Sequence, residues 1–157
     1  MFSLTTTTAE QTQGLGRQVG SLVTSGDVIL LDGDLGAGKT TFTKGLALGL
    51  GIKRPIKSPT FTIIREYQEG RLPLYHMDVY RLEAGGGDEL GLEEYFTGDG
   101  VSVIEWSQFV EDELPADYLM IQLRRMATNE NVRQLSFVAH GEHYQKIIEQ
   151  LEDLNHE

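Results

Sequence analysis

The sequence contains no cysteine among its 157 residues. Disulfide bonds, thiolate catalysis and thiolate-bound metals are therefore excluded, and the composition is compatible with a reducing compartment. The chain also lacks an apolar run close to the length of a bilayer span, and its first residues do not resemble a secretory signal. We therefore expect a cytoplasmic protein that makes no membrane contact. Its length favours a single domain over residues 1–157.

Positive charge is scarce and unevenly placed along the chain. The net charge is −11, and residues 82–117 contain eleven Asp and Glu residues but no Lys or Arg. Residues 39–81, in contrast, contain eight Lys and Arg residues against three acids. The acidic segment fits two interpretations, a solvated face of the protein or a face that meets a basic partner.

A glycine-rich motif follows an apolar segment in the first third of the chain. Residues 33–40 fit the pattern G-x-x-x-x-G-K-T, and the run 27–31 before them is typical of a buried strand. In such a P-loop, backbone N–H groups converge on phosphate oxygens and the lysine, here Lys39, contacts the β and γ phosphates. The Thr40 hydroxyl is expected on Mg²⁺, at the start of a helix whose dipole favours the anion. The motif predicts nucleotide phosphate binding rather than a chance glycine turn.

The hydrophobic pattern predicts an α/β protein. Phe42, Leu46 and Leu50 form one buried stripe of the P-loop helix, and Gly45 and Gly49 are expected to allow close packing. The expected elements are a helix at 9–24, a strand at 28–31, the P-loop helix, extended runs at 61–67 and 72–80, an acidic helix at 88–96, strands at 101–105, 118–126 and 134–139, and a helix at 142–154. This order fits a P-loop NTPase-like three-layer fold whose mixed sheet contains one antiparallel hairpin.

Two carboxylates stand at the ends of expected strands. Asp78 lies in the stretch YHMDVYRL, and Glu105 ends the strand VSVIE. Each is expected to bind magnesium or to position water, because a bound cation offsets the cost of burying a carboxylate; a surface acid at a strand end is the alternative. His76 is expected to pack in its strand rather than to act as a catalyst. Trp106 fits either the core or a partner surface.

The stretch KSPTFT, residues 57–62, supplies three hydroxyl groups between the P-loop and Asp78. Such a loop can close on a γ-phosphate and Mg²⁺ and relax after hydrolysis, as nucleotide switches do, or it can be only a turn into the hairpin. We count Thr60 of this loop, together with Lys39 and Asp78, as the candidate catalytic residues.

Three other functions fit parts of the pattern. A small-molecule or nucleotide kinase also uses a P-loop, but such kinases need lid arginines, and the sequence after Arg81 offers none until Arg124. A GTP-binding switch would need an Asn-Lys-x-Asp guanine motif, which the chain lacks, so ATP is favoured. A non-enzymatic module that binds ATP would release no phosphate, with or without partners.

Four linked motifs resemble the bacterial TsaE (YjeE) family: GDLGAGKTTFTKGL, SPTFTIIREY, HMDVYRL and VIEW, in this order and spacing. The resemblance covers nearly the whole chain. It implies a small P-loop ATPase of tRNA threonylcarbamoyladenosine biosynthesis, with ATP and Mg²⁺ as cofactors and with TsaD-like and TsaB-like proteins as partners. In this family ATP use supports turnover of the assembly that moves the threonylcarbamoyl group onto adenosine in the anticodon loop.

The resemblance also implies roles for individual residues. Thr40 and Glu105 match magnesium ligands, Asp78 matches the Walker-B-like or switch acid, and residues 58–61 match a loop likened to switch I. The residues expected to contact the nucleotide are Thr12, Gly33, Asp34, Leu35, Gly36, Ala37, Gly38, Lys39, Thr40, Thr41 and Arg133.

The charge distribution predicts how such a protein reaches tRNA. A protein that grips RNA by itself normally presents a basic face. Here Lys39 is committed to ATP, and residues 82–117 would repel an RNA backbone. We therefore expect tRNA contact only indirectly, through the partner proteins.

Overall fold

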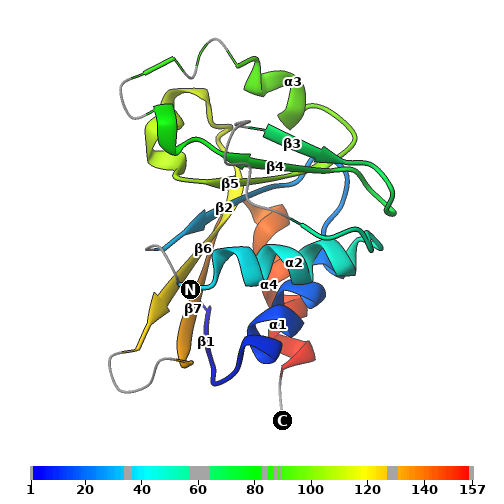
Figure 1. The fold of residues 1–157 in the computed structure, drawn as a ribbon, viewed down its shortest axis with the longest axis vertical. Coiled ribbons are helices and arrows are strands. Elements are labelled where there is room, and N and C mark those ends of the chain that lie inside the picture. Colours follow the sequence, from blue (N-terminus) through cyan, green and yellow to red (C-terminus); the bar gives the residue numbers. More distant parts are fainter. Residues whose placement is uncertain are drawn as a thin grey trace.

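The computed structural model describes residues 2–33, 37–56, 64–82, 85–86, 88, 90–126 and 131–155 (Figure 1). In chain order the elements are β1 (Phe2–Thr6), α1 (Ala9–Leu22), β2 (Val28–Asp32), α2 (Lys39–Gly49), β3 (Ile64–Tyr67), β4 (Leu74–Asp78), the 3₁₀ helix η1 (Tyr80–Leu82), α3 (Leu92–Phe96), β5 (Val101–Glu105), the 3₁₀ helix η3 (Ser107–Glu113), β6 (Tyr118–Arg125), β7 (Arg133–His140) and α4 (Glu142–Leu154). None of the helices in this part of the chain has the length and apolar character that a bilayer span requires.

The seven strands form one mixed sheet in the order β1-β7-β6-β2-β5-β4-β3. β2 pairs in parallel with β5 on one side and with β6 on the other, and β4 pairs in parallel with β5. β3 and β4 form the antiparallel hairpin that the sequence predicts. Two further antiparallel pairs, β6 with β7 and β7 with β1, extend the opposite edge. The predicted α/β fold with a mixed sheet is therefore confirmed.

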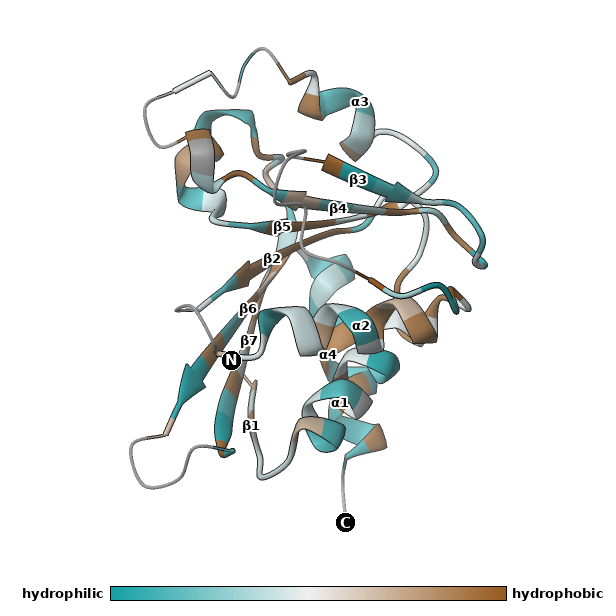
Figure 2. Ribbon diagram, in the orientation of Figure 1, coloured by the Kyte–Doolittle hydropathy of each residue, from teal (hydrophilic) through white to brown (hydrophobic). Residues whose placement is uncertain are grey.

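Helical segments cover the two faces of the sheet unequally. Figure 1 shows α1, α2 and α4 gathered on one side, whereas α3 and η3 lie on the other side, beside the end of the sheet that holds β3, β4 and β5. Leu31 of β2 and Phe42 of α2 belong to the core on the first side, and Leu30 of β2 and Leu92 of α3 belong to the core on the second. Figure 2 shows apolar residues concentrated on the central strands, which are buried on both faces.

Polar contacts fasten α4 to the start of β2. The Tyr144 hydroxyl accepts a hydrogen bond of 2.9 Å from the Val28 N–H, and burial raises the pKa of Tyr144 to about 12. His143 Nε2 lies 2.8 Å from Oδ1 of Asp27, a carboxylate that is only 4% exposed. These contacts hold the last helix against the strand that leads into the P-loop.

The helices α1 and α2 meet along a contact that only glycine allows. Gly16 and Gly20 of α1 and Gly45 and Gly49 of α2 leave no room for a Cβ, which at each position would overlap backbone atoms of the other helix. At Gly45 the overlap would be with the carbonyl of Gln13. The close packing expected for Gly45 and Gly49 is therefore present, and it sets α1 directly beside α2.

Several elements differ from the sequence-based expectation. The acidic helix begins at Leu92 rather than Asp88, because Gly91 has a φ of 66° and this left-handed conformation interrupts a regular helix. β1 is not predicted from sequence because it is a short edge strand with alternating, only partly buried side chains. η3 is not predicted either, because a 3₁₀ segment lacks the 3.6-residue period of an α-helix. In the hairpin, residues 61–63 lie outside the described residues.

The α1–α2 contact predicts a specific response to added side-chain volume. Gly45→Ala should lower the free energy of unfolding by roughly 1–3 kcal/mol, because the new methyl group collides with backbone rather than with a movable side chain. Gly14→Ala is the matched control, since a Cβ there meets nothing within 4 Å and alanine favours the helix by up to about 1 kcal/mol. Urea denaturation of both variants measures the difference. Equal stability of the two variants would show that α1 and α2 do not pack as described.

Candidate functional site

The P-loop leads from the central strand into α2, as the sequence predicts. β2 ends at Asp32, and α2 begins at Lys39. Gly38 precedes the helix with a φ of 104°, a backbone conformation that a residue with a side chain rarely adopts. Gly38 has no side chain that could cap this eleven-residue helix, and the N-terminus of a helix is the end that favours an anion.

The carboxyl ends of β4 and β5 bring the two predicted acids together. Asp78 and Glu105 are register partners in the parallel β4–β5 pair, and Leu31 of β2 is the partner of Glu105 on its other side. Side chains two residues apart in a strand share a face, so His76 lies on the same face as Asp78. This is the face that α2 covers, because Leu74 and Val103 on it belong to the core that contains α2.

Glu105 is held by two neighbouring side chains. Its Oε2 lies 2.7 Å from Nε2 of His76, and its Oε1 lies 3.8 Å from Nζ of Lys39. A carboxylate only accepts hydrogen bonds, so the His76 Nε2–H is the donor. His76 is 0% exposed and Glu105 is 4% exposed. His76 thus packs in its strand as expected, and it also fixes the orientation of a predicted magnesium ligand, which the sequence did not indicate.

Asp78 sits half-buried beside this group. Burial raises the pKa of its carboxyl above the ordinary value, the Tyr80 N–H opposes this with a hydrogen bond of 3.1 Å, and the nearby charge of Glu105 raises the pKa further. Lys39 and His76 lower it by smaller amounts. Asp78 is therefore a carboxyl group whose ionised form is disfavoured until a further cation approaches.

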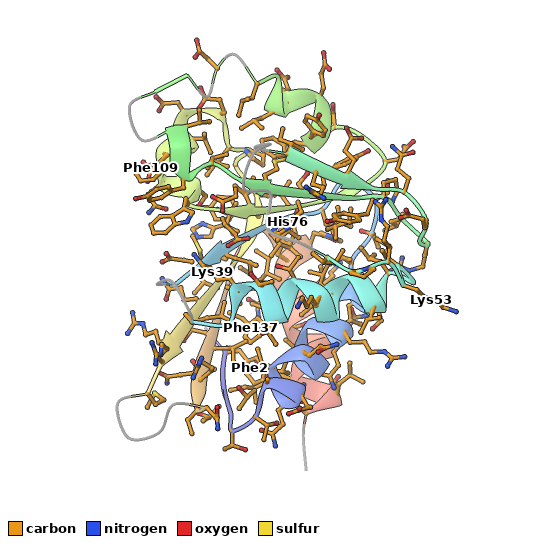
Figure 3. All side chains as sticks on the ribbon, in the orientation of Figure 1. Phe2, Lys39, Lys53, His76, Phe109 and Phe137 are labelled. Atoms are coloured by element: carbon orange, nitrogen blue, oxygen red, sulfur yellow. The ribbon has the colours of Figure 1, made fainter. Side chains whose placement is uncertain are left out.

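Trp106 joins the site through Lys39. The lysine Nζ lies 4.5 Å from the centroid of the indole ring, which is a cation–π contact. Trp106 is the only non-glycine residue with positive φ in the described part of the chain, at 62°. Its ring stacks on Phe109 with centroids 6.0 Å apart and lies 4.9 Å from the ring of Tyr80. Figure 3 shows Lys39 and Phe109 on the same side of the molecule.

A small hollow of about 50 Å³ lies beside the start of the P-loop helix. It is lined by Ala9, Thr12, Gly38, Thr41, Asn131 and Arg133. The Thr12 hydroxyl is 2.7 Å from that of Thr6, so the edge strand β1 helps to position it. The structure therefore places Thr12 and Arg133 beside Gly38 and Thr41, while their contact with a nucleotide stays a prediction.

Four predicted site residues lie outside the described residues. They are Asp34, Leu35 and Gly36 of the P-loop, and Thr60 of the hydroxyl-rich stretch. Gly33 and Ala37, on either side of the P-loop gap, line a hollow of about 320 Å³ together with residues of β6.

Binding of ATP and Mg²⁺ at this site stays a prediction. Within the described ranges no three His, Asp or Glu side chains are arranged to hold a metal ion. Magnesium bound with a nucleotide needs few protein ligands, because phosphates and water supply the others. The two predicted magnesium ligands are Thr40, in the first turn of α2, and Glu105, which lies beside Lys39 at the start of the same helix.

Removal of the His76 donor tests its positioning role. His76→Leu should lower the free energy of unfolding by roughly 1–3 kcal/mol, because the buried Glu105 carboxylate loses its hydrogen bond. His76→Gln is the matched variant, since its side-chain amide can reach the same oxygen, and it should recover part of that loss. Urea denaturation gives both values. If the Leu variant is as stable as the Gln variant, the 2.7 Å contact contributes nothing to the fold.

The raised pKa of Asp78 predicts a pH-dependent effect on stability. When the folded-state pKa lies above the unfolded value, ionisation destabilises the fold, and this cost appears as the pH rises through the folded-state pKa. Asp78→Asn keeps an acceptor for the Tyr80 N–H and removes the charge. With a chelator present, the variant should therefore have a higher melting temperature than the wild type at about pH 7.5 and the same melting temperature near pH 3. A wild type that melts higher at about pH 7.5 would contradict the direction of the shift.

Comparisons with known proteins agree with the motif order. The chain matches the family model described as threonylcarbamoyl adenosine biosynthesis protein TsaE over residues 6–135. A Bacillus subtilis (strain 168) protein named tRNA threonylcarbamoyladenosine biosynthesis protein TsaE is 49% identical over 146 residues, which cover 93% of this chain and 90% of the relative. A Treponema pallidum (strain Nichols) protein of the same name is 52% identical over 121 residues, 76% of this chain and 88% of the relative.

A solved structure extends the agreement to three dimensions. The crystal structure of Bacillus subtilis YdiB matches this fold with a TM-score of 0.86 at 44% identity, and the match covers 98% of this chain and 95% of that chain. The P-loop, the His76–Asp78 strand and the Glu105 strand all fall within the range of the family model. This chain belongs to the TsaE family of tRNA threonylcarbamoyladenosine biosynthesis proteins.

Proposed function

We propose that this protein is a magnesium-dependent ATPase that supports threonylcarbamoyl modification of tRNA adenosine. The observation that carries the proposal is the meeting of Lys39, Asp78 and Glu105 where β4 and β5 end and α2 begins. Membership of a tRNA threonylcarbamoyladenosine biosynthesis family supports the pathway. The chemistry of the site supports the reaction, which is transfer of the γ-phosphoryl group of ATP to water.

Phosphate binding is assigned to the P-loop and the start of α2. Backbone N–H groups at the helix N-terminus and the Lys39 ammonium would balance the negative charge of the β and γ phosphates. The Lys39 ammonium contacts both Glu105 and the Trp106 ring. In the ATP complex the ammonium exchanges part of these contacts for phosphate oxygens, so binding is expected to alter the surroundings of Trp106.

Thr40 and Glu105 would hold the magnesium ion that accompanies ATP. The ion neutralises charge that develops on the phosphate oxygens during phosphoryl transfer. His76 keeps one oxygen of Glu105 in a hydrogen bond, so the carboxylate already faces the start of α2 before ligand arrives. Such preorganisation reduces the reorganisation required when the substrate binds.

Asp78 is assigned to the attacking water. It lies in register beside Glu105, and in its ionised form it would accept a hydrogen bond from water and orient it toward the γ-phosphorus. Attack by the water oxygen would form the new bond to the γ-phosphorus and break the bond to the oxygen that bridges the β and γ phosphates. The products are ADP and inorganic phosphate, and the proton that the water loses passes to solvent. Thr60 is proposed as a hydroxyl that contacts the γ-phosphate from the 57–62 stretch.

Partner proteins complete the proposal. The chain carries a net charge of −11, which disfavours independent binding to an RNA backbone. We therefore assign tRNA contact to TsaD-like and TsaB-like proteins, with ATP binding and hydrolysis switching the surface that they meet. The isolated chain would then bind tRNA weakly even at low salt.

Lys39→Ala provides the direct test of the reaction. With ATP, Mg²⁺ and the TsaD-like and TsaB-like proteins present, the variant should release phosphate roughly 100-fold more slowly, because a phosphate-binding cation is lost. Lys44→Ala is the matched control, since Lys44 is an exposed lysine of the same helix, and it should keep wild-type activity. Removal of Mg²⁺ with a chelator should stop phosphate release by the wild type. Wild-type phosphate release by Lys39→Ala would refute the assignment.

A further inference from the structure

Two adjoining hollows lie on the face of the sheet opposite α1, α2 and α4. The first, of about 650 Å³, has a floor that includes Leu30, Tyr118 and Met120 and a wall formed by η3. The second, of about 500 Å³, lies between α3 and η3. Leu114 and Pro115 line both, so the two hollows share one wall and form a continuous surface.

This surface combines apolar walls with charge of one sign. Leu30, Leu114 and Met120 give the first hollow an apolar part beside its polar residues, and Leu92 and Phe96 contribute apolar surface to the second. The charged residues that line the two hollows are Asp32, Glu111, Asp88, Glu93, Asp112 and Glu113. No Lys or Arg lines either hollow, and none of these acids makes an ion pair with the rest of the described chain.

We propose that this acidic docking surface, defined by the six acids and the two hollows, binds a segment of a protein partner that carries Lys or Arg beside apolar side chains. Apolar walls gain free energy when a partner removes them from water. Five of the six acids lie in residues 82–117, which contain no Lys or Arg, so a basic partner would supply the counter-charge that this segment lacks. The sixth, Asp32, also lines the hollow that holds Arg124 and Arg125. An RNA backbone is excluded as the occupant by charge repulsion.

The acidic docking surface borders the nucleotide site at two points. Asp32 is the last residue of β2, and it lines both the first hollow and the hollow beside Gly33. Ser107 lines the first hollow and directly follows Trp106, whose ring contacts Lys39. In this respect the inference rests on the proposed function: a segment seated here would touch the elements that change their contacts when ATP binds.

A peptide probe tests the chemistry of the surface with the full chain. The probe is a fluorescent peptide of about 15 residues with leucine and lysine on opposite helical faces, and fluorescence polarisation gives its Kd. Glu111→Lys/Asp112→Lys should raise the Kd about tenfold or more, because attraction is replaced by repulsion at the hollows. Met120→Gln should raise it about threefold and leave its salt dependence unchanged, because the side chain keeps its size but loses apolar character.

A charge-matched variant distinguishes an effect of this surface from an effect of the net charge of the protein. Glu149→Lys/Glu152→Lys changes the net charge equally on exposed positions of α4, on the other side of the sheet, and should stay within about twofold of the wild type. Equal weakening by the two double variants, or no binding of the peptide by the wild type, would overturn the inference.

The TsaD-like and TsaB-like proteins then serve as the probe, with ATP and Mg²⁺ present. Glu111→Lys/Asp112→Lys should weaken association about tenfold and leave the Kd for ATP unchanged, because neither residue lines the hollows beside the P-loop. Wild-type association by this variant would overturn the inference and leave the proposed function intact. Failure of the wild type to hydrolyse ATP within the assembly would refute the proposed function, while the peptide result would still decide the inference.

Discussion

Parallel pairing of β4, β5 and β2 is the constraint on which the site depends. It places Asp78 opposite Glu105, and Glu105 opposite Leu31, at the edge of the sheet where the P-loop begins. A slip of one residue in β4 would turn His76 and Asp78 to the face that α3 and η3 cover, away from Lys39. The buried Glu105 would then lose its hydrogen-bond donor, and an unpaired buried carboxylate is strongly unfavourable. The register in which β4 pairs with β5 is thus also the one that brings Asp78 and Glu105 together.

The same region brings two carboxylates close to one lysine ammonium among the described residues. Asp78 and Glu105 stand close together with Lys39 as the neighbouring full cation, and the pKa of Asp78 is raised by burial and by Glu105. A divalent cation would offset the repulsion between the two carboxylates, and the phosphates that accompany it would engage Lys39 and the N-terminus of α2. The left-handed Trp106 links this charge cluster to η3. A shift of the Lys39 side chain would alter its contact with Trp106, and the next residue, Ser107, lines the acidic docking surface.

Local signals in the sequence predicted the P-loop, its flanking strand and helix, and the β3–β4 hairpin, because glycine spacing and apolar periodicity depend on near neighbours. The sequence predicts close packing only for Gly45 and Gly49, because the role of Gly16 and Gly20 depends on how α1 lies against α2. The bond between His76 and Glu105 depends on the register of two strands far apart in the chain, which no local pattern encodes. The alternation of His76 and Asp78 was the one available hint, since it places them on a common face. Edge strand β1 and the 3₁₀ segment η3 escaped prediction because neither has a strong apolar period.

Calorimetric titration of the isolated protein with ATP, with and without Mg²⁺, tests whether the P-loop and Glu105 form one site for magnesium and ATP. We expect one ATP bound per chain and a lower Kd when Mg²⁺ is present, because Thr40 and Glu105 would help to hold the ion that accompanies the phosphates. Binding that is indifferent to Mg²⁺, or no binding at millimolar ATP, would contradict this expectation.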